Sequence, residues 1–187
     1  AGSARAAGWP LRSAVIAWEY THDRRYLDFA RQLAHNALGQ LHPRLGYFSE
    51  PPATWHYRGG VPGMNSILAA GLMRYWRASD DADVGRAVSQ LAHDMAYSWM
   101  SPTQPGMVLS NDPLQTVYLV GYALQDVLPL FWGYELTGDV AFLDKADQVI
   151  RACILADEYR YQALGLSRYW ELQDVLYYLD VYRRLRG

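Results

Sequence analysis

The chain has 187 residues, of which 51% are apolar and 19% charged, with a formal net charge of −2. This is enough apolar material for one globular domain with a core. Because the charge is nearly balanced and Lys145 is the only lysine, no basic stripe is available to bind nucleic acid. No stretch supplies the about 20 uncharged apolar residues that a membrane-spanning helix needs, so we expect no membrane partner.

Cofactor and metal sites are not expected either. The single cysteine, Cys153, can form no internal disulfide and excludes a multi-cysteine metal or redox motif. We expect it to be a packed apolar thiol. The first residues lack the apolar segment of a signal peptide, which leaves the compartment open. A secreted or periplasmic location is favoured only if the protein acts on carbohydrate.

A turn recurs three times at constant spacing, starting at Thr21, Ser79 and Thr137. Each turn follows an aromatic-rich apolar run and precedes an amphipathic one, so the repeating unit is a helix, a tight turn and a second helix. An aspartate stands at the same register in each turn, where it is a favoured N-cap. The acidic cluster at residues 80–83 is therefore predicted to be a structural turn and not a metal-diphosphate site.

The elements predicted along the chain are seven helices, over residues 10–20, 24–41, 61–78, 82–99, 114–136, 140–158 and 167–186. The odd-numbered helices carry few charges and are expected to be inner, whereas the even-numbered ones keep a polar face and are expected to be outer. This predicts an all-α array of three helical hairpins plus one extra inner helix. The long connections, 41–60 and 101–113, must share one end of the array, where a functional site is expected.

Two stretches carry a family resemblance. Residues 8–12 with 18–28, and residues 134–146, resemble hairpins of the (α/α) toroids known as six-hairpin glycosidase-like proteins. That superfamily includes glycoside hydrolases and, on related toroids, polysaccharide lyases of the heparinase and alginate lyase groups. The resemblance implies a toroid fold and a carbohydrate substrate. A ring of six hairpins would need about 350 residues at this period. We therefore expect residues 1–187 to be one domain, either the C-terminal part of a larger toroid or an arc completed by another chain packed on the last helix.

The connection before the third helix is the richest in chemically active residues. A lyase acting on uronic-acid sugars must neutralise a carboxylate, remove a proton and protonate the leaving oxygen. His56, Tyr57 and Asn65 could fill these roles and are our first catalytic candidates. The alternative is a loop whose aromatic residues pack on the helix ends, with Asn65 as a cap.

Asp112 is the remaining catalytic candidate, as a general acid or base of glycoside hydrolysis paired with Glu50 or with a group outside the chain. Its alternative is an N-cap ahead of Pro113. Aromatic rings suited to sugar stacking and arginines suited to acidic sugars make up the substrate-binding candidates. These are Trp9, Arg12, Trp55, Arg58, Tyr118 and Arg168. For the arginines, surface ion pairing is the alternative.

These patterns favour a carbohydrate-active enzyme domain, a polysaccharide lyase or a glycoside hydrolase, with its cleft at the end that holds the long connections. The rival from a different class is a non-catalytic helical repeat that presents a binding or scaffold surface. The sequence leaves the choice between lyase and hydrolase open, and with it the substrate.

Overall fold

The computed structural model describes residues 3–44, 46–49, 59–100, 107–108, 118–119, 126–155 and 172–186. These residues form seven helices and one short antiparallel ladder of two strands. The expected all-α class is therefore confirmed for the described part of the chain. Within it, no helix combines the length and the apolarity needed to cross a bilayer.

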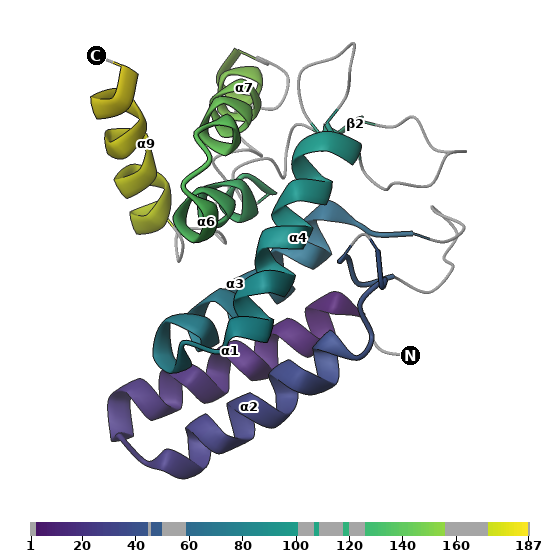
Figure 1. Ribbon diagram of the computed structural model, residues 1–187, viewed down its shortest axis with the longest axis vertical. Coiled ribbons are helices and arrows are strands. Elements are labelled where there is room, and N and C mark those ends of the chain that lie inside the picture. Colours follow the sequence, from purple (N-terminus) through teal and green to yellow (C-terminus); the bar gives the residue numbers. More distant parts are fainter. Residues whose placement is uncertain are drawn as a thin grey trace.

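The helices pair in chain order as hairpins. The first hairpin is α1 (Ala4–Thr21) with α2 (Arg24–Leu38), and the second is α3 (Pro62–Ser79) with α4 (Ala82–Ser98). The third is α6 (Leu128–Thr137) with α7 (Ala141–Leu155), followed by α9 (Leu172–Arg186). Figure 1 shows the second hairpin between the first hairpin and the group formed by α6, α7 and α9. The connection after α2, the start of α3, the end of α4 and the residue ahead of α6 lie on one side of the array, which we call the loop end.

The predicted start of the first helix, residue 10, is wrong by about two turns. Pro10 was expected to start it, but α1 begins at Ala4 and contains Pro10 at an exposed position. The Ser3 hydroxyl caps this earlier start by accepting the N–H of Ala6 at 3.2 Å. The cap and the alanine-rich first turn offset the one helix hydrogen bond that Pro10 cannot make.

The fifth predicted helix, 114–136, is wrong at residues 118–119. Tyr118–Leu119 form strand β2, which pairs with β1 (Met107–Val108) in the antiparallel register Met107 to Leu119 and Val108 to Tyr118. Tyrosine and valine are good strand formers, which explains why this apolar run is not helical there. The helix that follows, α6, begins at Leu128 and carries Pro129 in its first turn, where a missing N–H costs little.

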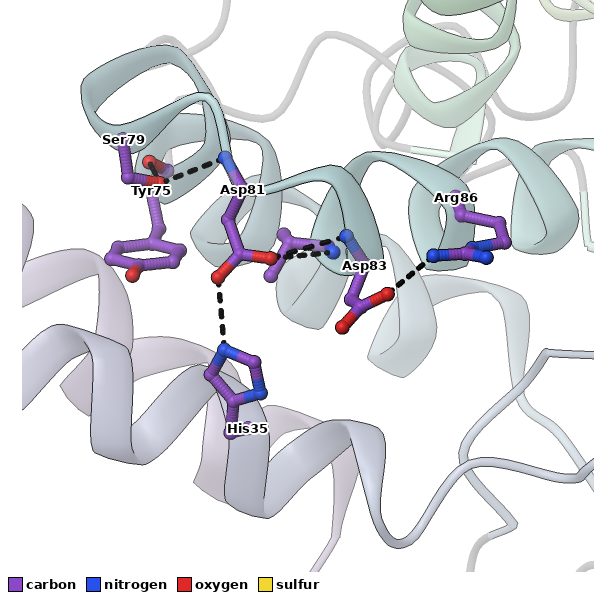
Figure 2. A network of polar contacts seen from close by, with 7 residues as sticks. His35, Tyr75, Ser79, Asp81, Asp83 and Arg86 are labelled. Atoms are coloured by element: carbon purple, nitrogen blue, oxygen red, sulfur yellow. Dashed lines mark hydrogen bonds and ion pairs between the residues drawn. The ribbon is translucent and has the colours of Figure 1, made fainter.

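The three repeated turns have one atomic structure. In each, a residue with positive φ closes the helix by donating its N–H to a carbonyl four residues back, over 2.7 Å; these residues are His22, Asp80 and Gly138. A hydroxyl side chain then accepts the N–H of the following aspartate; the hydroxyls belong to Thr21, Ser79 and Thr137. The aspartate caps the next helix by accepting the N–H two residues on; the aspartates are Asp23, Asp81 and Asp139. Figure 2 shows the middle turn. The prediction of a structural turn is confirmed.

Close packing of the first two hairpins rests on two glycines. A Cβ on Gly8 would lie 2.6 Å from the carbonyl oxygen of Ile67, and one on Gly71 would lie 2.8 Å from the carbonyl oxygen of Gly8. Helices α1 and α3 can therefore approach backbone to backbone. The next interface differs, because α6 packs more extensively against α4 than against α3.

Burial follows the inner and outer assignment in part. Helices α3 and α6 are buried along most of their length, as expected for inner helices. Helix α1 is less so, because it lies at the edge of the array and leaves Trp9 and Tyr20 exposed. Helix α4 buries one face between α3 and α6 and exposes another that includes Arg86, His93 and Tyr97.

Candidate functional site

The buried polar side chains of the described residues gather at the loop end. They are Asn65, Ser66, Asp94 and Asp126. Asn65 and Ser66 lie in the first turn of α3, Asp94 lies near the end of α4, and Asp126 precedes α6. Buried polar groups cost free energy unless they are hydrogen-bonded, so their gathering at one end marks it as the candidate site.

Asp94 is a carboxyl buried in the core, where an ionisable side chain is unusual. It is 3% exposed, and the Ser98 hydroxyl one turn on is its nearest hydrogen-bonding group, although neither carboxylate oxygen forms a well-aligned hydrogen bond within the described ranges. Burial raises the pKa of Asp94 above its ordinary value, while the nearby Ser98 hydroxyl and the histidines His42 and His93 lower it by less. The carboxyl therefore keeps its proton to a higher pH than an exposed aspartic acid does, which is the property of a general acid.

A row of rings lies at the same end, which we call the aromatic row: His42, Tyr47 and Trp99. His42 stacks on Tyr47 with ring centroids 5.1 Å apart, and Tyr47 meets Trp99 at 5.9 Å. Trp99 follows α4 directly, is fully buried, and has an indole Nε1 without a hydrogen-bond partner in the described chain.

The row depends on Gly60. A Cβ at this position would lie 2.5 Å from Cζ2 of Trp99 and 2.9 Å from Cδ2 of Tyr47. The backbone ahead of α3 can therefore pass against both rings only because residue 60 has no side chain.

Asn65 holds the connection after α2 against the start of α3. Its Oδ1 accepts the N–H of Phe48 at 2.7 Å, and its Nδ2 donates to the carbonyl oxygens of Phe48 and Val61, each at 3.1 Å. Both amide hydrogens are thereby used within the fold. This geometry corresponds to the packing alternative considered for Asn65 and makes it a positioning residue.

Ser66 and Asp126 join α3 to the start of α6. The Ser66 hydroxyl lies 3.0 Å from the carbonyl oxygen of Pro62 and 3.3 Å from Oδ1 of Asp126. A hydroxyl has one hydrogen to donate, so it can serve only one of these acceptors at a time. Asp126 is thus a second buried carboxyl at the loop end.

Two of the predicted substrate-binding residues share one face of α1. Trp9 is 38% exposed, and the guanidinium carbon of Arg12 lies 5.8 Å from the centroid of its ring. This is the distance of a cation–π contact. Tyr118 lies in β2, of which the structure describes the backbone alone. The other candidates, His56, Tyr57, Asp112, Trp55, Arg58 and Arg168, lie outside the described residues and stay predictions.

Sequence reasoning missed Asp94. Its signal is a carboxylate inside an otherwise apolar stretch of an amphipathic helix, next to Leu91, Ala92, Met95 and Ala96. The helical period places it beside the buried stripe of α4, where a charge needs an explanation. The aspartates singled out in the sequence were those that cap helices, whereas Asp94 lies inside α4 and caps no helix.

Clusters of metal-binding type are not found in the described ranges: no three or more His, Cys, Asp or Glu side chains there could hold an ion together. The chain matches no known family model, and comparison with curated proteins and with solved structures finds no match either.

Proposed function

We propose that the chain is a carbohydrate-active domain, a polysaccharide lyase or a glycoside hydrolase, that reacts at the loop end with Asp94 as its general acid. The observation that carries the proposal is the buried carboxyl of Asp94, whose pKa is raised by burial more than Ser98, His42 and His93 lower it. Groups perturbed in this way concentrate at functional sites, because catalysis requires them and stability does not.

The chemistry of glycosidic cleavage explains why such a carboxyl is useful. Both reactions must protonate the oxygen of the leaving sugar, and an ordinary aspartic acid has already lost its proton near neutral pH. Burial raises the pKa of Asp94, which is the direction that favours the protonated acid. The aromatic row supplies flat apolar faces of the kind on which sugar rings stack. Asp126 and the predicted Asp112 are the candidates for a second carboxyl group.

The toroid belongs to the same proposal. Three turns of one structure, repeating in chain order, are what an arc of a helical-hairpin toroid requires. The ion pair from Arg77 of α3 to Glu135 of α6, 2.7 Å long, joins residues one repeat apart, as expected for neighbouring inner helices. Because Asp94 is 3% exposed, the proposal also requires its surroundings to open when a saccharide binds.

The test is a panel of neutral and uronic-acid polysaccharides. A lyase produces an unsaturated uronate, which is followed by its ultraviolet absorbance, and a hydrolase produces new reducing ends. We expect Asp94→Asn to lower the activity by about 100-fold or more while leaving the protein folded. The control is Asp180→Asn, which alters an exposed carboxylate of α9 and should leave the rate unchanged. A panel with neither product rejects the enzymatic proposal.

A non-catalytic helical repeat is the second candidate. The occupied amide of Asn65 and the near-complete burial of Asp94 favour it, since catalytic groups must reach a substrate. In that case Asp94→Asn leaves every activity and every binding affinity unchanged, and only stability responds.

A further inference from the structure

A second feature lies away from the loop end, on the exposed side of α2 that borders the turn between α3 and α4. A groove of about 680 Å³ runs along this helix and is lined by Asp28, Arg31, Gln32, His35 and Asn36. Their spacing places all five on one face of the helix, over slightly more than two turns. The volume falls in the range of about 300–1,000 Å³ that small-molecule sites occupy, but this groove is largely open to solvent and all five lining residues are exposed.

The histidine of this groove has a fixed orientation. Nε2 of His35 lies 2.9 Å from Oδ2 of Asp81, the aspartate that caps α4, and this contact is drawn in Figure 2. A carboxylate accepts, so Nε2 carries the hydrogen, and in the neutral ring Nδ1 is left as an acceptor. Figure 2 shows Nδ1 on the side of the ring turned away from Asp81. The second hairpin thus orients a side chain of the first.

The remaining lining groups have free hydrogen-bonding capacity. In the described part of the chain, Arg31 forms no ion pair, and the side-chain amides of Gln32 and Asn36 bond to no other group. Asp28 has one distant partner, Arg24, at 3.9 Å, and both of these side chains are largely exposed. Such a pair contributes little and leaves the carboxylate available.

The balanced charges and the mixed donors and acceptors of the groove favour an uncharged ligand that carries hydroxyl groups over an anion. The guanidinium of Arg31 is balanced by the carboxylate of Asp28, so an anion would gain one partner and meet one repulsion. Donors and acceptors alternate along the helix, and the two amides offer both. Hydroxyl groups, which also donate and accept, match such a lining. Phe29 adds an exposed ring, 50% accessible, three residues before Gln32 and seven before Asn36, at the edge of the same face.

We propose that the groove along α2 is a saccharide-binding site for short neutral oligosaccharides, separate from the loop end. Arg31, Gln32 and Asn36 bond the hydroxyls, Asp28 and Nδ1 of His35 accept from them, and Phe29 stacks on a sugar face. The site requires no reaction at Asp94, so it stands whether or not the chain is an enzyme. In an enzyme it would hold a polysaccharide away from the reacting bond.

The experiment is an NMR titration of the full chain with short gluco-, manno- and xylo-oligosaccharides. We expect binding by at least one of them, with shifts centred on residues 28–36. Arg31→Ala and Asn36→Ala should each weaken it about tenfold, because each removes hydrogen bonds that water replaces only in part. These positions are exposed, so the variants should fold normally. Arg183→Ala, which alters an exposed arginine of α9, is the matched control and should bind like the wild type.

Asp28→Asn separates a saccharide from an anion. It should weaken a saccharide by removing an acceptor, whereas it should strengthen an anion by removing a repulsion. Affinity that rises in Asp28→Asn and falls with added salt would identify the groove as an anion site and overturn the proposal. So would the absence of binding by all three series at millimolar concentration. Asp94→Asn should keep the groove affinity, so failure of the loop-end reaction and failure of the groove are told apart.

Discussion

Replacing Asp94 with asparagine tests whether the fold holds this carboxyl at a cost in stability. The substitution keeps the size of the side chain and removes the ionisable group. In the folded protein the carboxyl is 3% exposed and forms no well-aligned hydrogen bond in the described chain, so the nearby Ser98 hydroxyl replaces its lost hydration only in part. A buried unsatisfied polar group costs about 1–3 kcal/mol, and more when it is charged. We expect Asp94→Asn to raise the free energy of unfolding at pH 7 by about 1–2 kcal/mol.

The gain should depend on pH in a defined direction. The folded-state pKa of Asp94 is raised above its unfolded value, with burial as the main cause. The protonated carboxyl therefore contributes its stability fully below the unfolded pKa, and this contribution is lost as the pH rises through the folded pKa. Asparagine does not titrate. The advantage of Asp94→Asn should be largest at pH 7 and should shrink toward acidic pH, where the wild-type carboxyl is neutral too.

Urea denaturation followed by tryptophan fluorescence, at pH 7 and at about pH 4, measures both quantities. Asp180→Asn serves again as the control, because an exposed pair on one helix contributes little and should change stability by at most about 0.5 kcal/mol. A loss of stability in Asp94→Asn that is larger at pH 7 than at pH 4 contradicts the reasoning, since it would mean that favourable partners hold the ionised carboxylate in the fold.

Three further predictions concern single contacts. Gly60→Ala should destabilise the protein by about 1–3 kcal/mol and change its near-ultraviolet circular dichroism, because the new Cβ meets Trp99 at 2.5 Å. Its control is Gly39→Ala, where φ is ordinary for a helix and the new Cβ would lie 3.7 Å from its nearest neighbours; this variant should be neutral or stabilising in the same denaturation assay. Asn65→Ala should cost about 2–4 kcal/mol by leaving the buried N–H of Phe48 without its acceptor, and an unchanged urea midpoint would argue against the clamp. Asp81→Ala should cost about 1–2 kcal/mol through loss of the α4 cap. Burial alone would raise the pKa of Asp81, but the hydrogen bonds from His35 and from the N–H groups of Val84 and Asp83 outweigh it and lower the pKa. Its contribution is therefore present above the unfolded pKa and lost as the pH falls through the folded one, so wild type and Asp81→Ala should converge in acid.

The local structure of this chain could be predicted because it depends on neighbouring residues. The turns at Thr21, Ser79 and Thr137 need a hydroxyl, a residue that tolerates positive φ and a capping aspartate, and all three requirements are visible within a few letters of sequence. The prediction of a helix over residues 114–136 was wrong because part of this segment depends on a partner elsewhere in the chain. Residues 118–119 pair with residues 107–108, and such a partner cannot be read from apolar periodicity alone.

The sequence indicated which end of the array to search for a site, but it did not single out Asp94. The lengths of the connections indicated the loop end, and the buried polar residues of the described chain do gather there. Of the residues named in advance for catalysis, Asn65 is the one within the described ranges, and the backbone of Phe48 and Val61 uses its amide. Asp94 was passed over because its burial depends on tertiary packing, and His42, one of the groups that acts on it, comes from the connection after α2.

Repeat position explains both the groove and the buried carboxyl. Asn36 and Asp94 stand one repeat apart, in corresponding places on α2 and α4. Helix α2 lies at the edge of the array, so Asn36 is exposed and lines the groove, whereas α4 is packed against both α3 and α6 and its Asp94 is buried. The same repeat position therefore holds an exposed amide, Asn36, in the first hairpin and a buried carboxyl, Asp94, in the second. The repeat shows that the two positions correspond in sequence. The helices packed around each position then determine whether its side chain is exposed or buried. If this is correct, Asn36→Asp should add a carboxyl with an ordinary pKa, because α2 lacks the cover that raises the pKa of Asp94, and NMR titration of the two carboxyls in that variant would compare them directly.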